Sequence, residues 1–163
     1  MVLAAQILGK AAVLDGRNAL QTQAYGAEAR GSLTKSEVII AEGKIGFPAV
    51  RKCDILVTMS QEATNGLLKD LKETGTLIVD SSSVKDVPAT KAEVRRFSIT
   101  ETARTKFGGA LYANMVMLGV LLGTARMVSV ESVEKAIRER TTLKTADTNI
   151  RAFKEGLLLE PGR

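Results

Sequence analysis

The sequence predicts an α/β fold in which a mostly parallel β-sheet carries helices on both faces. The first observation is a β-α-β unit: residues 53–59 and 76–82 are apolar runs typical of buried strands, and the amphipathic stretch 61–73 between them is typical of a helix. The second is composition, because only 4% of the residues are aromatic and packing must rest on aliphatic side chains, which suits helices laid against a sheet. The length of 163 residues fits one domain with one core.

The amino-terminal part of the chain predicts a buried helix followed by two strands. Residues 2–14 are apolar on nearly every side, which predicts a helix covered on most of its surface, and an Asp-Gly pair ends it. Residues 17–22 alternate weakly and predict a short strand, and the β-branched run 37–41 predicts another. A glycine-bearing loop, residues 24–35, connects them.

Local signals mark the two ends of the helix in the β-α-β unit. Ser60 directly precedes the helical pattern and can accept a hydrogen bond from one of its first amides. Glu62 places a negative charge in the first turn, where the helix dipole favours it. Gly75 is expected to stop the helix before the second strand begins.

The second half of the chain predicts one short strand and three helices. Residues 97–100 are expected to form the strand. The predicted helices are a long, mostly buried one that kinks at its glycines (100–126), one through 133–140 capped by Ser129 or Ser132, and a last one that includes 149–158.

The chain lacks the residues on which most enzyme and metal sites depend. It has no histidine and a single cysteine, Cys53, so it cannot form an internal disulfide, an iron–sulfur cluster or a zinc site by itself. No paired-carboxylate or HExxH-like pattern is visible. We therefore predict no catalytic residue and no metal ligand in this chain, and we expect Cys53 to be an inert core residue.

Charge and hydropathy argue against two further classes of partner. The net charge is +5, but the basic residues are spread along the chain beside acidic ones, as in VRKCD and EKAIRERT, so no nucleic-acid-binding face is expected. The most apolar run, residues 110–125, is shorter than the roughly 20 residues that span a bilayer, and no signal peptide precedes a cleavage site. We therefore predict a cytoplasmic protein that binds neither nucleic acid nor membrane.

Five segments, taken in order, resemble one protein family. They are VLAAQILGKAAVLDG, AYGAEARGS followed by SEVIIA, DILVTMSQEA, TLIVDSS and ANMVMLGVLLG. The same order is found in the gamma subunits of 2-oxoacid:ferredoxin oxidoreductases. The second segment is most similar to the 2-oxoglutarate type, whose loop reads Tyr-Gly-Pro-Glu-x-Arg-Gly-Gly. The resemblance runs from Val2 to about Phe153, which is nearly the whole chain.

The resemblance implies a Rossmann-like domain that works as one subunit of a thiamine-diphosphate enzyme. Such a complex oxidatively decarboxylates a 2-oxoacid, transfers the acyl group to coenzyme A and passes electrons through iron–sulfur clusters to ferredoxin. The thiamine diphosphate lies between alpha and beta subunits, other chains hold the clusters, and a small ferredoxin-like delta subunit is a further partner. The chain itself is then expected to be architectural, to share in coenzyme A binding, and to be inactive alone.

The chain departs from the family pattern in two places. Ala27 stands where the loop usually has Pro, and Ser32 replaces its second Gly. The family also begins with a strand and a Gly-x-Gly-Gly-Gln-Gly turn, whereas here Met1 and its neighbours already correspond to the helix that follows. The expectation is a single domain over residues 1–163 that lacks this strand and turn. Either the assigned start lies too late or the chain begins at Met1, and in the second case the exposed sheet edges predict a homodimer or strand exchange in the isolated chain.

Ligands of open α/β sheets meet the loops beyond the carboxyl ends of the strands, and three loops are expected there: 24–35, 59–62 and 80–85. In the last of these, Asp80 and the three serines after it are expected to form a turn and a cap rather than a ligand site. Asn114, in an apolar helix, is expected to bond to a neighbouring backbone group.

The first loop carries the candidate site residues for coenzyme A or for a partner subunit: Tyr25, Gly26, Glu28, Arg30 and Gly31. The two glycines permit close backbone approach, the arginine offers a forked donor for phosphate or carboxylate, and the glutamate can hold that arginine in place. A plain glycine-bearing connection with a surface ion pair is the other interpretation.

A different class of function also fits the predicted fold: a stand-alone nucleotide-binding or regulatory domain without redox partners. Co-purification with an iron–sulfur protein would favour the oxidoreductase subunit, and tight nucleotide binding by the isolated chain would favour the alternative. The sequence leaves open which 2-oxoacid is used, because selectivity is expected on other subunits.

Overall fold

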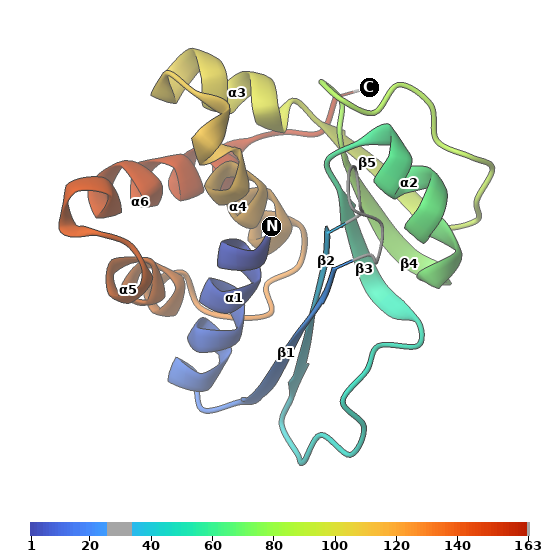
Figure 1. The fold of residues 1–163 in the computed structure, drawn as a ribbon, viewed down its shortest axis with the longest axis horizontal. Helices are drawn as coiled ribbons and strands as arrows, with labels where there is room; N and C mark the ends of the chain where they lie inside the picture. The colour runs from blue at the N-terminus through green and yellow to red at the C-terminus, as the bar shows by residue number, and fades with distance from the viewer. Residues whose placement is uncertain (26–33, 163) are drawn as a thin grey trace.

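The computed structural model describes residues 1–25 and 34–162 (Figure 1). Its elements, with η for a 3-10 helix, are α1 (Val2–Leu14), β1 (Asn18–Tyr25), β2 (Thr34–Ala41), β3 (Cys53–Thr58), α2 (Gln61–Leu67), η1 (Leu68–Asp70), β4 (Leu71–Asp80), β5 (Glu93–Phe97), α3 (Ile99–Phe107), η2 (Ala110–Tyr112), α4 (Ala113–Thr124), α5 (Val130–Arg140) and α6 (Leu143–Leu158). Figure 1 shows α2 on one side of the strands and the other five α-helices on the opposite side. The predicted α/β class is confirmed.

Strands β3, β4 and β5 form a parallel sheet in that order. β3, α2 and β4 make the predicted β-α-β unit, and Ser60 caps α2 as expected, because its hydroxyl accepts a hydrogen bond from the Ala63 amide at 3.2 Å. The helix is shorter than predicted: it ends at Leu67, and β4 already begins at Leu71.

Burial explains why the chain leaves the helix early. Leu71 is buried in a small core with Leu56 and Leu77, so tertiary packing favours a strand at this position over the local preference for helix. The prediction that Gly75 stops the helix is therefore wrong, because Gly75 is a residue of β4. A Cβ at Gly75 would lie 2.7 Å from the carbonyl oxygen of Asp54, so the close approach of two backbones requires glycine there.

Strands β1 and β2 form a separate antiparallel hairpin, with register from Asn18 opposite Ala41 to Tyr25 opposite Thr34. Both strands are eight residues long and extend further toward the connecting loop than predicted. A continuous cross-strand ladder explains this, because every second added pair gains backbone hydrogen bonds and the pairs between them gain side-chain contacts, neither of which the sequence pattern reveals. Among the described residues, β2 pairs only with β1 and β3 pairs only with β4.

The second half of the chain contains more breaks than predicted. The predicted strand 97–100 is displaced, since β5 ends at Phe97 and α3 begins at Ile99. The predicted helix 100–126 is two helices, because Gly108 takes a left-handed conformation (φ 77°) that ends α3. Ser129 is the cap of α5, and its hydroxyl accepts from the Ser132 amide at 3.2 Å.

Helices α4 and α6 cross in direct backbone contact. A Cβ at Gly119 would lie 2.1 Å from the carbonyl oxygen of Phe153, and one at Gly156 would lie 2.0 Å from that of Val116. The two glycines thus let the helices approach more closely than any side chain permits. Around this crossing lies the main core, in which Met115 and Phe153 are fully buried.

Candidate functional site

The loop predicted to carry the site is only partly described. Tyr25 ends β1, where it lies opposite Thr34 in the hairpin. Gly26, Glu28, Arg30 and Gly31 lie outside the described residues. The site can therefore be built from the base of this loop, where β1 ends and β2 begins.

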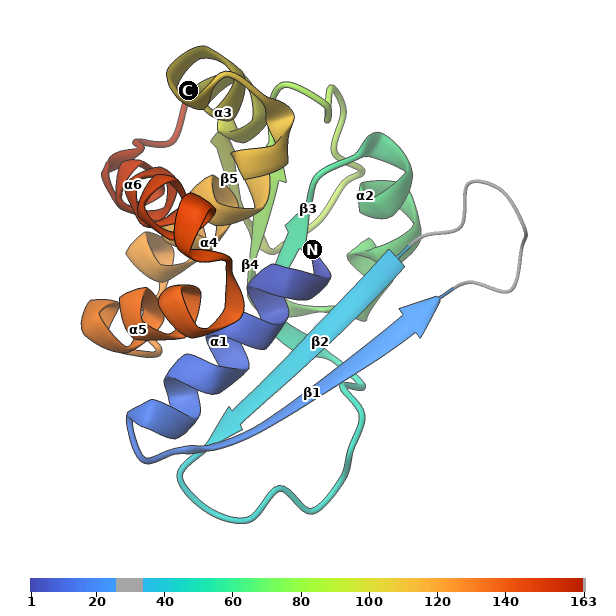
Figure 2. The same cartoon turned by 60° about the vertical axis from the view of Figure 1, so that its left-hand side comes forward.

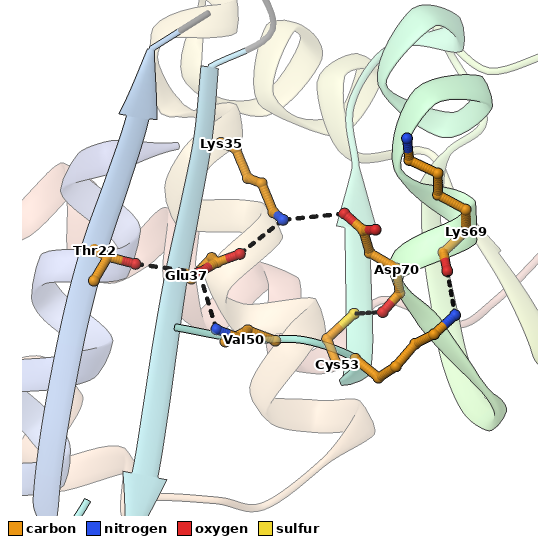
Figure 3. Close-up of polar contacts among 8 residues, drawn as sticks. Thr22, Lys35, Glu37, Val50, Cys53, Lys69 and Asp70 are labelled. Atoms are coloured by element: carbon orange, nitrogen blue, oxygen red, sulfur yellow. Dashed lines mark hydrogen bonds and ion pairs between the residues drawn. The ribbon is translucent and has the colours of Figure 1, made fainter. Parts of the chain in front are cut away.

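Lys35, at the start of β2, is the centre of a polar cluster at the loop base (Figure 3). Its ammonium lies 2.7 Å from a carboxylate oxygen of Glu37 and 3.1 Å from one of Asp70. Glu37 also accepts hydrogen bonds from the Thr22 hydroxyl at 3.2 Å and from the Val50 amide at 3.3 Å. The cluster thus joins the hairpin to the parallel sheet and to the segment before β3.

The cluster holds its charges in place. Partial burial by itself would lower the pKa of Lys35, but hydrogen bonds to Glu37 and Asp70 outweigh it, and the pKa is raised. Partial burial would likewise raise the pKa of Glu37, but the bonds from Lys35 and the Val50 amide outweigh it, and the pKa is lowered. The ammonium of Lys35 is therefore charged and paired with two carboxylates, those of Glu37 and Asp70.

The position of the cluster corrects the expectation that three loops share the carboxyl edge of the sheet. Asp70 directly precedes β4, and Cys53, which begins β3, donates its thiol hydrogen to the Asp70 carbonyl oxygen at 3.4 Å. Lys35, the last residue of the expected loop, thus lies at the amino ends of β3 and β4. That expectation assumed one continuous sheet, whereas β1 and β2 form a sheet separate from β3, β4 and β5.

Cys53 itself is half-buried rather than a core residue. Burial raises the pKa of its thiol, which keeps it protonated and a weak nucleophile, in agreement with the expected inert role. Near it, the ammonium of Lys52 donates to the carbonyl oxygen of Lys69. Both contacts fasten the start of β3 to η1 (Figure 3).

At the carboxyl edge of the sheet, Asp80 is fully buried and organises the loop after β4. Its carboxylate accepts from the amide and hydroxyl of Thr100 at 3.2 and 2.5 Å, from the Ser82 amide at 3.2 Å and from the Ser83 hydroxyl at 3.3 Å. This confirms the expected turn and cap. Because the carboxylate already lies at the start of α3, that helix end offers no place for a phosphate.

Gln61, the first residue of α2, closes the loop after β3, a role that no local sequence pattern predicts. The side-chain oxygen of Gln61 accepts from the amides of Lys85 and Asp86 at 3.0 and 3.1 Å, and its nitrogen donates to the Asp86 carbonyl oxygen at 2.6 Å. Only a contact between distant loops reveals this role. The loops after β3 and β4 are therefore bonded to each other through Gln61.

Asn114 differs from its prediction. It was expected to bond to a neighbouring backbone group, yet its side-chain oxygen is buried without a partner in the part of the chain that the structure describes. Ser36, on β2, is in the same situation, with a buried hydroxyl that has no partner there. Unpaired buried polar atoms are uncommon, so both positions merit an explanation.

A cleft of about 1250 Å³ separates the hairpin from the parallel sheet. We call it the strand cleft, because β2 and β3 form its two walls. Its remaining lining includes apolar residues of α1, α4 and α2 and of the segment before β3, among them Met1, Ala4, Leu8, Met117, Leu118, Leu121, Leu67 and Phe47. Charged residues also line it, among them Arg17, Arg51, Lys52, Glu62, Asp70 and Lys72. Figure 2 shows the hairpin lying across β3, with the first turn of α1 beside both.

Across residues 1–25 and 34–162, no group of three or more His, Cys, Asp or Glu side chains is placed to hold a metal ion. None of the described helices is long and apolar enough to cross a membrane. The described residues provide a set of inter-element bonds and one large cleft, lined by apolar side chains together with charged ones such as Lys35 and Glu37.

Comparison with known proteins gives one consistent result. Residues 1–159 match the family model described as pyruvate ferredoxin/flavodoxin oxidoreductase. The 2-oxoglutarate synthase subunit KorC of Methanothermobacter thermautotrophicus is 40% identical over 172 aligned residues, which cover 100% of this chain and 91% of the relative.

Two solved structures share the fold. The keto/oxoacid ferredoxin oxidoreductase gamma subunit from Geobacter sulfurreducens superposes with a TM-score of 0.86 at 39% identity, covering 96% of this chain and 88% of that one. The 2-oxoglutarate:ferredoxin oxidoreductase from Magnetococcus marinus, solved with 2-oxoglutarate, coenzyme A and succinyl-CoA bound, superposes with a TM-score of 0.81 at 16% identity. That likeness covers 94% of this chain and 27% of the longer one, and it shows the fold alone.

Proposed function

This chain belongs to the pyruvate ferredoxin/flavodoxin oxidoreductase family, and on that premise we propose that it is the coenzyme A-contacting gamma subunit of a complex that oxidises 2-oxoglutarate. The match confirms the resemblance seen in the sequence: the chain is homologous to gamma subunits of 2-oxoacid:ferredoxin oxidoreductases and is a subunit of such a complex. The choice of 2-oxoglutarate rests on the relatives named 2-oxoglutarate synthase, which align over nearly their whole length.

The observation that carries the proposal is the match over almost the whole chain, combined with the absence of histidine and the single cysteine. In the proposed reaction, one 2-oxoacid, one coenzyme A and two oxidised ferredoxins give acyl-coenzyme A, carbon dioxide, two reduced ferredoxins and a proton. Bound thiamine diphosphate and iron–sulfur clusters would supply the carbanion stabilisation and the electron transfer. Iron–sulfur clusters need several cysteine ligands and this chain has one cysteine, so we assign the clusters to other subunits, and we propose that thiamine diphosphate lies between the alpha and beta subunits.

We propose alpha and beta subunits as the direct partners, with a ferredoxin-like delta subunit as a further component and ferredoxin as the electron acceptor. The complex is proposed to be cytoplasmic. For the isolated chain we propose a homodimer, because the unpaired edges of β2 and β3 favour pairing with a second copy. The alternative of a stand-alone nucleotide-binding domain gains no support at the carboxyl edge, where Asp80 occupies the start of α3.

The proposed contact with coenzyme A rests on Arg30, in the segment Tyr25 to Gly31. Coenzyme A carries several phosphate charges, and the guanidinium fork forms paired, charge-assisted bonds with phosphate. Lys35 does not compete for this role, because Glu37 and Asp70 already hold its ammonium. Arg30 is therefore the cation that we assign to coenzyme A or to an acidic group of a partner subunit.

Replacing Arg30 with Gln in the assembled complex tests this assignment. Losing a charge-assisted pair is expected to raise the KM for coenzyme A about tenfold or more, while the KM for the 2-oxoacid stays unchanged. Arg140→Gln, an exposed arginine at the end of α5, is the matched control and is expected to change neither value. If R30Q instead prevents assembly, the residue serves the subunit interface. Unchanged assembly together with unchanged coenzyme A affinity would contradict both roles.

A further inference from the structure

Helix α6 lies at the outside of the helical layer, with α4 between it and the strands (Figure 1, Figure 2). Its inner side packs into the main core, in which Ile150, Ala152 and Phe153 are buried. Its other side is exposed and carries Leu143, Lys144, Asp147, Arg151, Lys154 and Leu158. We call these six residues the outer face of α6. All six belong to the described part of the chain, and none of them lines the strand cleft.

The outer face of α6 carries a leucine at each end. Leu143 is 93% exposed and Leu158 is 79% exposed. About four helical turns separate them, so both lie on the same side of the helix, roughly 22 Å apart along its axis. The outward side of an amphipathic helix is ordinarily polar. Contact with apolar side chains of another molecule would remove both leucines from water.

The two carboxylates of α6 are engaged by neighbouring helices. The guanidinium of Arg138, on α5, lies 2.9 Å from the carboxylate of Asp147. The ammonium of Lys106, on α3, lies 2.5 Å from the carboxylate of Glu155. Each negative charge of α6 is therefore already balanced by a cation from another element.

Two of the three cations of α6 are not balanced in this way. Lys154 pairs with Glu134 of α5 at 2.8 Å, whereas Lys144 and Arg151 form no ion pair with any carboxylate among the described residues. About two turns separate Lys144 from Arg151, so they also lie on one side of the helix. The guanidinium of Arg151 lies 5.9 Å from the ring centre of Phe107, which holds it in place.

The outer face of α6 thus combines two unbalanced cations with two exposed leucines. We propose that it docks an acidic protein surface of a partner subunit. Carboxylates of that surface would meet Lys144 and Arg151, and its apolar side chains would cover Leu143 and Leu158. Protein interfaces combine such apolar contacts with complementary charges. The inference rests on the proposed subunit role, but not on the contact with coenzyme A or on the choice of 2-oxoacid.

Two other occupants fit this surface less well. A nucleic acid would neutralise the cations through its phosphates but would leave both leucines in water. A second copy of the chain, docked about a two-fold axis, would place the same cations opposite each other, and like charges in an interface oppose association. An acidic protein surface satisfies both the charges and the leucines.

The experiment compares tagged chains in the assembled complex. The test variant is Leu143→Ser with Lys144→Glu, which removes one exposed leucine and reverses one unbalanced charge. The matched control is Val13→Ser with Lys44→Glu, which makes the same kinds of change at exposed positions on other elements. The complexes are purified through the tag and diluted in steps, and the partner subunits that remain bound give an apparent Kd.

The test variant is expected to raise this Kd about tenfold or more, while the control and Lys144→Arg leave it unchanged. The thermal unfolding of the isolated chain is expected to be the same for all, because the two replaced side chains make no bond in the described structure and a glutamate in the first turn suits the helix dipole. Added salt is expected to weaken the unmodified complex more than the variant complex.

An unchanged Kd for the test variant, or an equal rise for the control, would overturn the proposal. So would a variant that keeps its partner subunits but loses self-association or bound nucleic acid. If the test variant does not fold, Arg151→Gln with Leu158→Ser replaces it, with the same expected rise and the same contradicting results. If the unmodified chain itself retains no partner subunit, the proposed function fails and this inference fails with it, whereas equal retention of variant and unmodified chains overturns the inference alone.

Discussion

At the scale of single residues, Asp80 contributes most to the order of the carboxyl edge. It is fully buried and accepts four hydrogen bonds from the turn after β4 and from the start of α3. The amide of Asp80→Asn can accept with only one oxygen and carries no charge. We expect this variant to lose about 2–3 kcal/mol of unfolding free energy in urea denaturation.

The control for Asp80 is Asp86→Asn, which changes an exposed carboxylate in the adjoining loop. The side chain of Asp86 makes no bond in the described structure, so its replacement is expected to change stability by less than about 0.5 kcal/mol. Equal effects of D80N and D86N would show that Asp80 is not the organiser of this loop.

Glu37 gives the fold a dependence on pH. Its pKa in the folded chain is lowered from its ordinary value of 4.5, so its contribution is complete above that value and is lost as pH falls through the folded pKa. Compared with Glu37→Gln, the native chain is expected to be about 1 kcal/mol more stable near pH 7, with the difference vanishing in acid.

Urea unfolding at several pH values checks this prediction, with Glu42→Gln as the matched control. Glu42 is an exposed carboxylate just beyond β2, and its replacement is expected to give a small difference that does not change with pH. A constant difference between the native chain and E37Q down to about pH 3 would show that the carboxylate of Glu37 is not coupled to folding.

The residues that the sequence could predict are those with local partners. Ser60 and Ser129 each accept a bond from an amide three residues later, a spacing visible in the sequence. The link from Lys35 to Asp70 spans 35 positions and depends on how the hairpin tilts, so no local pattern could reveal it. Asn114 was recognised as a buried amide, but its surroundings were not predictable.

At the scale of elements, the crossing of α4 and α6 is the tightest contact in the described core. A methyl group at Gly119 or Gly156 would overlap the carbonyl oxygens of the other helix at about 2 Å. Gly119→Ala and Gly156→Ala are each expected to cost about 3 kcal/mol or more, because neither backbone can move without disturbing the core. Thermal or urea unfolding measures this loss.

Gly9→Ala is the control for the helix crossing. Gly9 also lies in a helix and is buried, but a Cβ there would meet only the Cβ of Gln21, at 4.0 Å. Alanine also forms helices better than glycine, so this variant is expected to be neutral or to gain up to about 1 kcal/mol. Similar losses for G9A and G119A would mean that the close crossing is not the cause.

The existence of most elements followed from hydrophobic patterns, whereas several boundaries did not. The β-α-β unit was predicted because its strands are apolar throughout and its helix has a cap. The helix of this unit was predicted to reach residue 73, because residues 68–73 also have a helical pattern. The burial of Leu71 in the core favours a strand there instead, and this burial is not visible in the sequence. In the same way, the glycines in 100–126 predicted a kink, but the left-handed Gly108 ends a helix there.

At the scale of the whole molecule, the strands divide into an antiparallel hairpin and a parallel three-stranded sheet. The strand cleft lies between the two. The described residues provide structural bonds and no group placed to hold a metal. The fold class and the family could be predicted from the sequence, because five separate segments resemble the same family in the same order. The division of the strands into two sheets could not be predicted, since strand pairing depends on which edges face each other.

Purification of the native complex through a tag on this chain tests whether the chain works as a gamma subunit. Thiamine-diphosphate-binding and iron–sulfur subunits are expected to co-purify with the tagged chain in constant proportion. These fractions are expected to reduce ferredoxin with 2-oxoglutarate only when coenzyme A is present. If the tagged chain elutes alone, with the coenzyme A-dependent activity in fractions that lack it, the chain is not a subunit of this complex.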